Sequence, residues 1–400
     1  EFLIPFNKDG SIGKDYGFSG KISNSSIYIN KEFSLKKLTT EIKHRKELEY
    51  DIFEINIKKG IFYDLELAGT KISLKRGNNK TGIKSTLYTN GKINFEQLKK
   101  VSTLLNLSLD NLKNIEGKIN LETNINLDLN KDFKFENLSY LIEGNLNSLK
   151  IQLKDKKIIK KFFPDYNSRI VLKNTKIKIN NLPSSQKAEL AGLIAINNKF
   201  DDFRVTEQYN FKKNFFDING LIKTTNSKII LPALNYTKER ETKSEINFNI
   251  NFAFKKYYNI RNLTLSSENT KVNLSDIKLN KNFEVVDFEK IEAKTFINEI
   301  KNNDFLIKKT NKITIKGEIF DAHPILKSLY KKSSKKTFDK NFSSKIKINF
   351  DKVLTGTNDD VSNFALIASI NNGSYNKLSL KGNFSENEIV EMSIYQVDKD

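Results

Sequence analysis

The sequence predicts a mostly β protein, built on an extended, curved antiparallel sheet (a β-groove) with a few short helices. Three observations predict this fold class: long runs in which apolar and polar residues alternate, a glycine that recurs inside such runs, and the scarcity of helical periodicity. A β-sandwich is the alternative, because a sheet with one apolar face can also hide that face against a second sheet.

Two long runs of alternation carry the prediction. One-sided alternation is typical of antiparallel sheets with one wet face, since strands of a parallel sheet covered by helices are apolar almost throughout. The first run spans residues 118–130 and the second spans residues 245–254. We expect the apolar residues of both runs to line a surface for lipid: Ile119, Leu121, Ile125, Leu127, Leu129, Ile246, Phe248, Ile250, Phe252 and Phe254. Shorter runs at residues 61–67 and 346–350 predict further strands.

A weak repeat of the form apolar, any residue, Gly, any residue, apolar overlies these runs. A glycine inside a strand usually marks a bulge, a bend or a close backbone approach, so the repeat predicts a sheet that curves at defined places. Its spacing is too irregular for a solenoid with a fixed period. The glycines of the repeat are Gly20, Gly117, Gly144, Gly192, Gly220, Gly317 and Gly382.

Helical signals are few. Apolar residues at three- and four-residue steps predict one amphipathic helix near residues 95–107, with Asn94 as its N-cap. A short basic helix that Pro164 ends is expected to plug a sheet end. The pair Asn372-Gly373 predicts a tight hairpin in a C-terminal strand meander. We divide the chain into an N-terminal glycine-punctuated segment (1–154), a middle β segment (155–310) and a C-terminal module (311–400).

Composition excludes several classes of chemistry. The chain has no cysteine and two histidines, His44 and His323, so thiolate chemistry is excluded and a transition-metal site would depend mainly on carboxylates. We find no glycine-rich phosphate loop and no nucleophile elbow. Asp321, His323 and Pro324 resemble a catalytic cluster, but a capped helix start explains them better. We therefore expect no enzyme, no cofactor and no metal.

The net charge of +20 raises the question of nucleic acid. The lysines are spread along the chain, and the densest cluster, Lys331, Lys332, Lys335 and Lys336, is typical of a solvated loop. Aromatic residues interleave with lysine at residues 254–261, but tyrosine and phenylalanine are also preferred in strands. We expect no nucleic-acid partner.

The C-terminal stretch resembles a known family. The order "IKGEIFDAHPILKSLY", a lysine-rich link, and then a meander that "LKGNF" closes is similar to the C-terminal part of the AsmA-like (TamB- and YhdP-type) envelope proteins of Gram-negative bacteria. The resemblance is specific over roughly the last 90 residues and general in style upstream.

The resemblance implies a periplasmic body that an upstream segment anchors in the inner membrane. It implies a curved sheet whose apolar face holds phospholipid acyl chains, and a link to lipid movement between membranes and to outer-membrane integrity. It brings no catalytic residues. Because the chain opens at Glu1 and its only methionine is Met392, we expect a fragment or a processed product with any anchor upstream. The alternative function is a structural or adhesive β-sandwich region of a secreted surface protein.

Overall fold

The chain divides into two units, which are described separately. The computed structural model describes residues 1–13, 15–28, 34–47, 49–105, 109–110, 112–132, 134–154, 157–253, 257–330, 342–357, 359–385 and 388–395. Unit 1 comprises Glu1–Asp155 and Ser168–Phe216, and unit 2 comprises Lys156–Asn167 and Asp217–Asp400. The division of the sequence into three segments stays a prediction.

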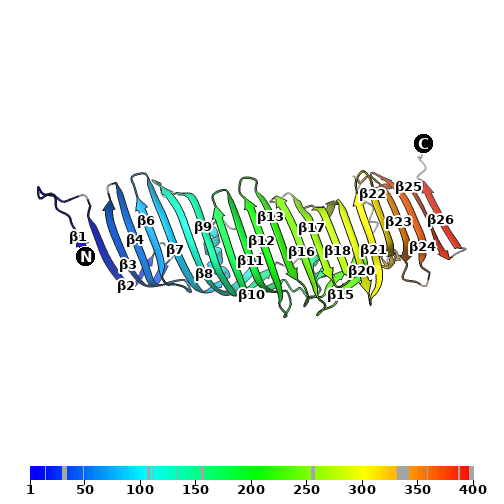
Figure 1. Ribbon diagram of the computed structural model, residues 1–400, viewed down its shortest axis with the longest axis horizontal. Helices are drawn as coiled ribbons and strands as arrows, with labels where there is room; N and C mark the ends of the chain where they lie inside the picture. The colour runs from blue at the N-terminus through cyan, green and yellow to red at the C-terminus, as the bar shows by residue number, and fades with distance from the viewer. Residues whose placement is uncertain are drawn as a thin grey trace. The chain divides into compact units, whose positions relative to one another are not determined.

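Unit 1 is an open sheet of consecutive antiparallel strands with one short helix, α1 (Phe95–Leu105) (Figure 1). β5 and β6 share the position between β4 and β7. The strands are β1 (Phe2–Leu3), β2 (Gly17–Tyr28), β3 (Ser34–Glu47), β4 (Tyr50–Phe62), β5 (Leu65–Leu67), β6 (Thr70–Arg76), β7 (Lys80–Asn94), β8 (Leu112–Asn130), β9 (Phe135–Leu153), β10 (Arg169–Leu182), β11 (Ser185–Ala195) and β12 (Asp201–Asn210).

Unit 2 is a second series of strands with two short helices, α2 (Lys157–Phe162) and α3 (His323–Tyr330), and the 3-10 turn η1 (Pro232–Leu234). The first two residues of β13 belong to unit 1. The strands are β13 (Phe215–Lys223), β14 (Ile229–Leu231), β15 (Tyr236–Lys238), β16 (Ser244–Ala253), β17 (Tyr257–Ser267), β18 (Thr270–Leu279), β19 (Val285–Asp287), β20 (Lys290–Ile297), β21 (Ile300–Lys309), β22 (Ile313–Asp321), β23 (Ser344–Leu354), β24 (Val361–Asn371), β25 (Ser374–Ser385) and β26 (Glu388–Tyr395).

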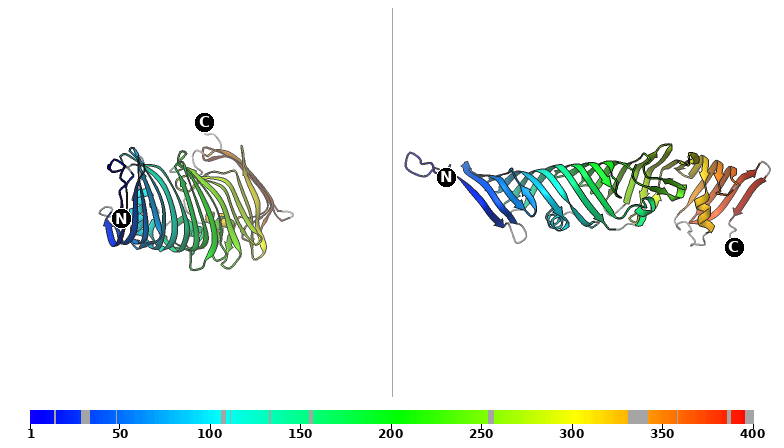
Figure 2. Two further views of the ribbon diagram at one scale, coloured as in Figure 1. Left: turned by 60° about the vertical axis from the view of Figure 1, so that its left-hand side comes forward. Right: turned by 90° about the horizontal axis from the view of Figure 1, so that it is seen from below.

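The predicted fold class is confirmed: the protein is mostly β, with extended, curved sheet and few short helices (Figure 2). Among the described residues, the one other sheet is the two-stranded β14–β15, so no second large sheet forms a sandwich. The expectation of a purely antiparallel sheet is wrong at one place, where β22 pairs with β23 in parallel. Parallel neighbours need a crossover connection, and α3 lies in the segment that joins these two strands.

Most of the recurring glycines lie where a side chain would have no room, against a neighbouring backbone at Gly117, Gly144, Gly192 and Gly317 and against a side chain at Gly220 and Gly382. At six of the seven, a Cβ atom would overlap a neighbouring atom, and Gly20, which faces open space, is the exception. At Gly144 the φ of +154° is also unfavourable for an L residue, and the overlap is with the carbonyl oxygen of Asn120. The β8–β9 register shifts by one residue between Lys118 and Ile119, next to Gly117. A one-residue shift of this kind marks a β-bulge or an irregularity in the ladder, and a bulge bends a sheet locally. The role of the whole repeat in curving the sheet stays a prediction.

The predicted helix near residues 95–107 is present as α1. Asn94 and Gln97 form a reciprocal capping box: the Gln97 backbone N–H donates to Asn94 Oδ1 at 3.0 Å, and the Asn94 N–H donates to Gln97 Oε1 at 2.9 Å. The Gln97 side-chain amide also donates to Asp64 at 3.2 Å, which ties α1 to the turn before β5.

Two local predictions have opposite outcomes. Asn372 and Gly373 both have positive φ, as a type I′ turn requires, so the predicted hairpin between β24 and β25 is confirmed. The prediction of one strand over residues 61–67 is wrong, because β4 ends at Phe62 and β5 starts at Leu65. Tyr63 has a φ of +55° in the intervening turn, so the alternation there spans a hairpin.

The small β14–β15 hairpin, η1 and α2 cover part of one face of unit 2. Ile229 and Tyr236 of the hairpin are buried against Leu265, Val272 and Ala293 of the large sheet. Phe163, which follows α2, packs against the same core. Sequence reasoning missed Lys238, which is only 2% exposed. Its ammonium donates to the carbonyl oxygens of residues 224, 225 and 227, and so fixes the hairpin to the chain that precedes it.

Candidate functional site

The apolar face of unit 2 contains a continuous row of ten apolar side chains, which we call the unit 2 row. Each member lies directly opposite the next one on the neighbouring strand, so all ten share one face. The row runs from β16 to β26 through Phe248, Leu263, Leu274, Ile291, Ile307, Ile315, Ile348, Leu366, Leu380 and Met392.

Cover over this face is uneven. A parallel row two residues along the strands begins at Ile246 and includes Leu265, Val272, Ala293 and Phe305. These side chains form the core under the β14–β15 hairpin. At the other end of the sheet, Met392 and Ile394 of β26 are 42% and 51% exposed. The face therefore passes from a closed core to open apolar surface.

Unit 1 has a comparable apolar face. One row joins Thr89, Leu121, Gly144, Ile177, Leu190 and Val205 across β7 to β12. Ile119 is buried, and Leu121, Ile125, Leu127 and Leu129 are half-buried. Half-burial of large aliphatic residues is the pattern of a single-layer sheet whose apolar side has no complete protein cover.

The sequence-predicted lining residues fall into two sets in different units. Ile119, Leu121, Ile125, Leu127 and Leu129 all lie on β8 with their side chains on one face. Ile246, Phe248, Ile250 and Phe252 lie on one face of β16. Phe254, and the lysines from Lys331 to Lys336, lie outside the described residues. The lipid-lining role of both sets stays a prediction.

Polar side chains interrupt the unit 1 face at one edge. This polar cluster consists of Tyr140, Asn181, Gln186, Glu207 and Tyr209. Four of its members form one row, and Glu207 lies in the next row, opposite Ala188. Burial raises the pKa of the Glu207 carboxyl, while a hydrogen bond from Gln186 acts in the opposite direction. Burial and the charge of Glu207 also raise the pKa of Tyr140. Sequence reasoning missed this cluster, although a glutamate in the apolar phase of "FRVTEQY" was the signal.

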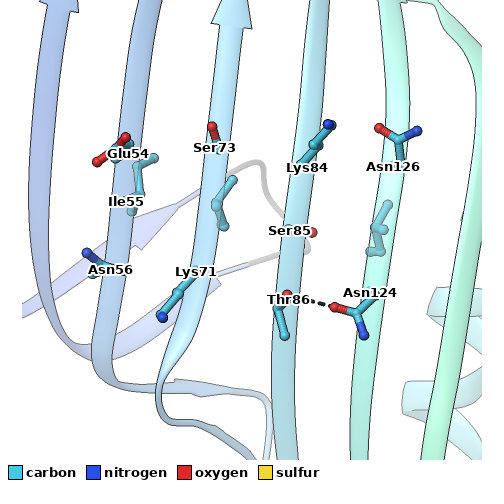
Figure 3. Close-up of a pocket in the computed structure, with 12 residues that line it drawn as sticks. Glu54, Ile55, Asn56, Lys71, Ser73, Lys84, Ser85, Thr86, Asn124 and Asn126 are labelled. Atoms are coloured by element: carbon cyan, nitrogen blue, oxygen red, sulfur yellow. Dashed lines mark hydrogen bonds between the residues drawn. The ribbon is translucent and has the colours of Figure 1, made fainter.

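The opposite face of unit 1 is polar and carries a shallow hollow of about 510 Å³ over β4, β6, β7 and β8 (Figure 3). Glu54, Lys71, Lys84 and Asn126 stand on it, and Thr86 donates to Asn124 at 2.7 Å. Several lysines of unit 1 pair with carboxylates, among them Lys58–Glu41, Lys80–Asp128, Lys150–Glu116, Lys178–Glu143 and Lys187–Glu189. Mixed charge of this kind is typical of a solvated sheet face.

Each of the two histidines makes contacts that hold the fold together. His44 is buried among Tyr16, Phe18 and Phe53, and its Nε2 lies 3.0 Å from Asp51 Oδ1. This contact is the main reason why the pKa of Asp51 is lowered. His323 begins α3, and its backbone N–H donates to Asp321 Oδ1 at 3.1 Å, as the helix-start interpretation predicted. The other carboxyl oxygen of Asp321 accepts from Asn235 and Asn302, so this aspartate belongs to a buried structural network.

Over the described part of the chain, no group of three or more histidine or carboxylate side chains is arranged to hold a metal ion. None of the helices in that part is both long and apolar enough to span a bilayer.

Fold and site together define a class: a protein of open, single-layer β-sheet in which one face of each unit is apolar and incompletely covered. Comparison of the chain with known proteins finds no relative. No family model matches the chain, and no curated protein and no solved structure matches it.

Proposed function

We propose that this chain is a non-enzymatic lipid-handling protein whose apolar sheet faces hold or conduct phospholipid acyl chains. The observation that carries the proposal is the unit 2 row, ten apolar side chains without a polar interruption from Phe248 to Met392. Removing apolar surface from water contributes about 0.8 kcal/mol per buried CH₂. Such a row therefore binds hydrocarbon without any head-group chemistry.

The proposal extends to the cellular setting that the C-terminal resemblance implies. In this setting the chain lies in the periplasm, an upstream segment anchors it in the inner membrane, and it supports outer-membrane integrity by passing lipid between the two membranes. The unbroken row supports movement as well as binding, because an acyl chain meets similar surface at each step across the strands.

The first test is to purify the 400-residue chain from cells and to identify bound molecules by native mass spectrometry and organic extraction. We expect co-purifying phospholipid. A folded chain that carries no lipid, and takes up none from vesicles, would contradict the proposal. Oligomers that bury the apolar faces in the same preparation would favour the structural or adhesive alternative.

A further inference from the structure

Binding of acyl chains to apolar faces does not explain the polar cluster of unit 1. An acyl chain gains nothing from Glu207 or Gln186, and a carboxyl in apolar surroundings opposes folding unless it is neutral or paired. Glu207 ends a row on one face of the sheet, and the apolar or small side chains of five strands precede it: Leu87, Thr123, Ile142, Ile179 and Ala188.

Glu207 also lacks a basic partner among the described residues. The side chain that contacts its carboxyl is the amide of Gln186, and no lysine or arginine contributes to its electrostatic surroundings. This is unusual in a chain of net charge +20 in which many exposed carboxylates pair with lysine. The missing positive charge is one that a ligand can supply.

The position of the cluster suits the polar end of an amphiphile. The row of Tyr140, Asn181 and Gln186 lies where β10 and β11 approach their hairpin turn, since Leu182 pairs with Ser185. Val205, which belongs to the apolar row of unit 1, lies two residues further from this turn than Glu207 does. Each residue of a strand adds about 3.3 Å to that separation. The polar cluster therefore lies next to an apolar surface, as the polar head group of an amphiphile lies next to its hydrocarbon chains.

We propose that the polar cluster binds the head group of a single lipid, that this head group carries a primary ammonium, and that Glu207 is its counter-ion. Gln186 positions the carboxyl, and the Tyr140 hydroxyl offers a hydrogen-bond donor for the rest of the head group. The acyl chains extend over Leu190 and Val205. This inference rests on the proposed function, because it names the class of lipid that unit 1 selects.

The test is a competition between head groups. The 400-residue chain is mixed with vesicles of equal parts phosphatidylethanolamine and phosphatidylglycerol with identical acyl chains, recovered, and analysed by native mass spectrometry. We expect about tenfold enrichment of the ethanolamine lipid on the protein, as a charge-assisted hydrogen bond supports. Glu207→Gln keeps the shape of the side chain, removes its negative charge, and should bring the enrichment close to one.

A matched control is Glu189→Gln on β11. Glu189 lies on the opposite face, where it pairs with Lys187, so this variant should keep the enrichment. Equal binding of the two lipids by the unmodified chain, or undiminished enrichment in Glu207→Gln, would overturn the head-group inference and leave the lipid proposal standing. Absence of any bound lipid would overturn both.

Discussion

The Asn235 side-chain amide donates to Asp321 Oδ2 at 2.8 Å across 86 residues of sequence. Asp321 thereby joins three parts of unit 2: the turn after η1, strand β21 through Asn302, and the start of α3 through the backbone of His323. In the sequence, Asp321 and His323 resemble a catalytic pair. In the structure, Asp321 is the centre of a hydrogen-bond network that holds three parts of unit 2 together.

Replacing Asp321 by alanine is expected to destabilise unit 2 by about 3 kcal/mol. The change removes the acceptor of two side-chain amides and the cap of α3, and unpaired buried donors are costly. Urea unfolding followed by circular dichroism measures the effect. Asp351→Ala on the exposed side of β23 is the control and should change stability by less than about 0.5 kcal/mol. Equal effects of the two changes would refute the structural role of Asp321.

Gly144→Ala is expected to destabilise unit 1 by about 2 to 3 kcal/mol, because its new methyl group would overlap the backbone of β8 and the φ is unfavourable. Gly20→Ala belongs to the same sequence repeat but meets no neighbour, so a neutral or slightly stabilising effect is expected. Thermal unfolding of the two variants separates them. A neutral Gly144→Ala would show that close approach does not require this glycine.

Lipid binding should depend on which face of β24 is changed. Leu366 belongs to the unit 2 row, whereas its neighbour Ile367 faces the other side and is 55% exposed. Leu366→Asn is expected to reduce bound lipid by at least about threefold, since it removes apolar contact area. Ile367→Asn is expected to leave bound lipid unchanged. Quantitative extraction of lipid from both purified variants measures this, and equal losses would count against the assigned face.

The raised pKa of Glu207 gives a pH-dependent signature. Above the ordinary carboxyl pKa of about 4.3, the unfolded chain ionises this group while burial in the folded chain opposes ionisation. The unmodified protein therefore loses stability as the pH rises from that value through the folded pKa. In the absence of lipid, Glu207→Gln should be as stable as the unmodified chain near about pH 3 and more stable near about pH 7. Urea midpoints at both pH values test this, and a pH-independent difference would contradict it.

Much of this fold follows from short-range patterns. Alternation around Leu121 and Phe248 places both residues on apolar faces, and the turn at Asn372 follows from its glycine neighbour. The reversal of the chain at Tyr63 was missed because the alternation of apolar and polar residues continues without a break through the tight turn. The contact of Asn235 with Asp321 was missed because no periodicity reports which distant segments meet.

The candidate site was only partly accessible to sequence reasoning. Its apolar residues follow from alternation, but the strand register that unites ten of them in one row is set by bulges whose positions the pattern does not fix. Glu207 was visible as an out-of-phase residue on β12. Its surroundings depend on which residues of β9, β10 and β11 lie beside it, and that depends on the same register.

Strand pairing in both units is local along the chain. Each register determined for the described strands joins a strand to the next one in sequence or to the next but one. The free energy of such an assembly is close to a sum of nearest-neighbour terms, as in repeat proteins, and short loops close before long ones. Folding of either unit can therefore start at any hairpin and spread outward, and urea should melt the chain over a broad range in which separate groups of strands are lost one after another.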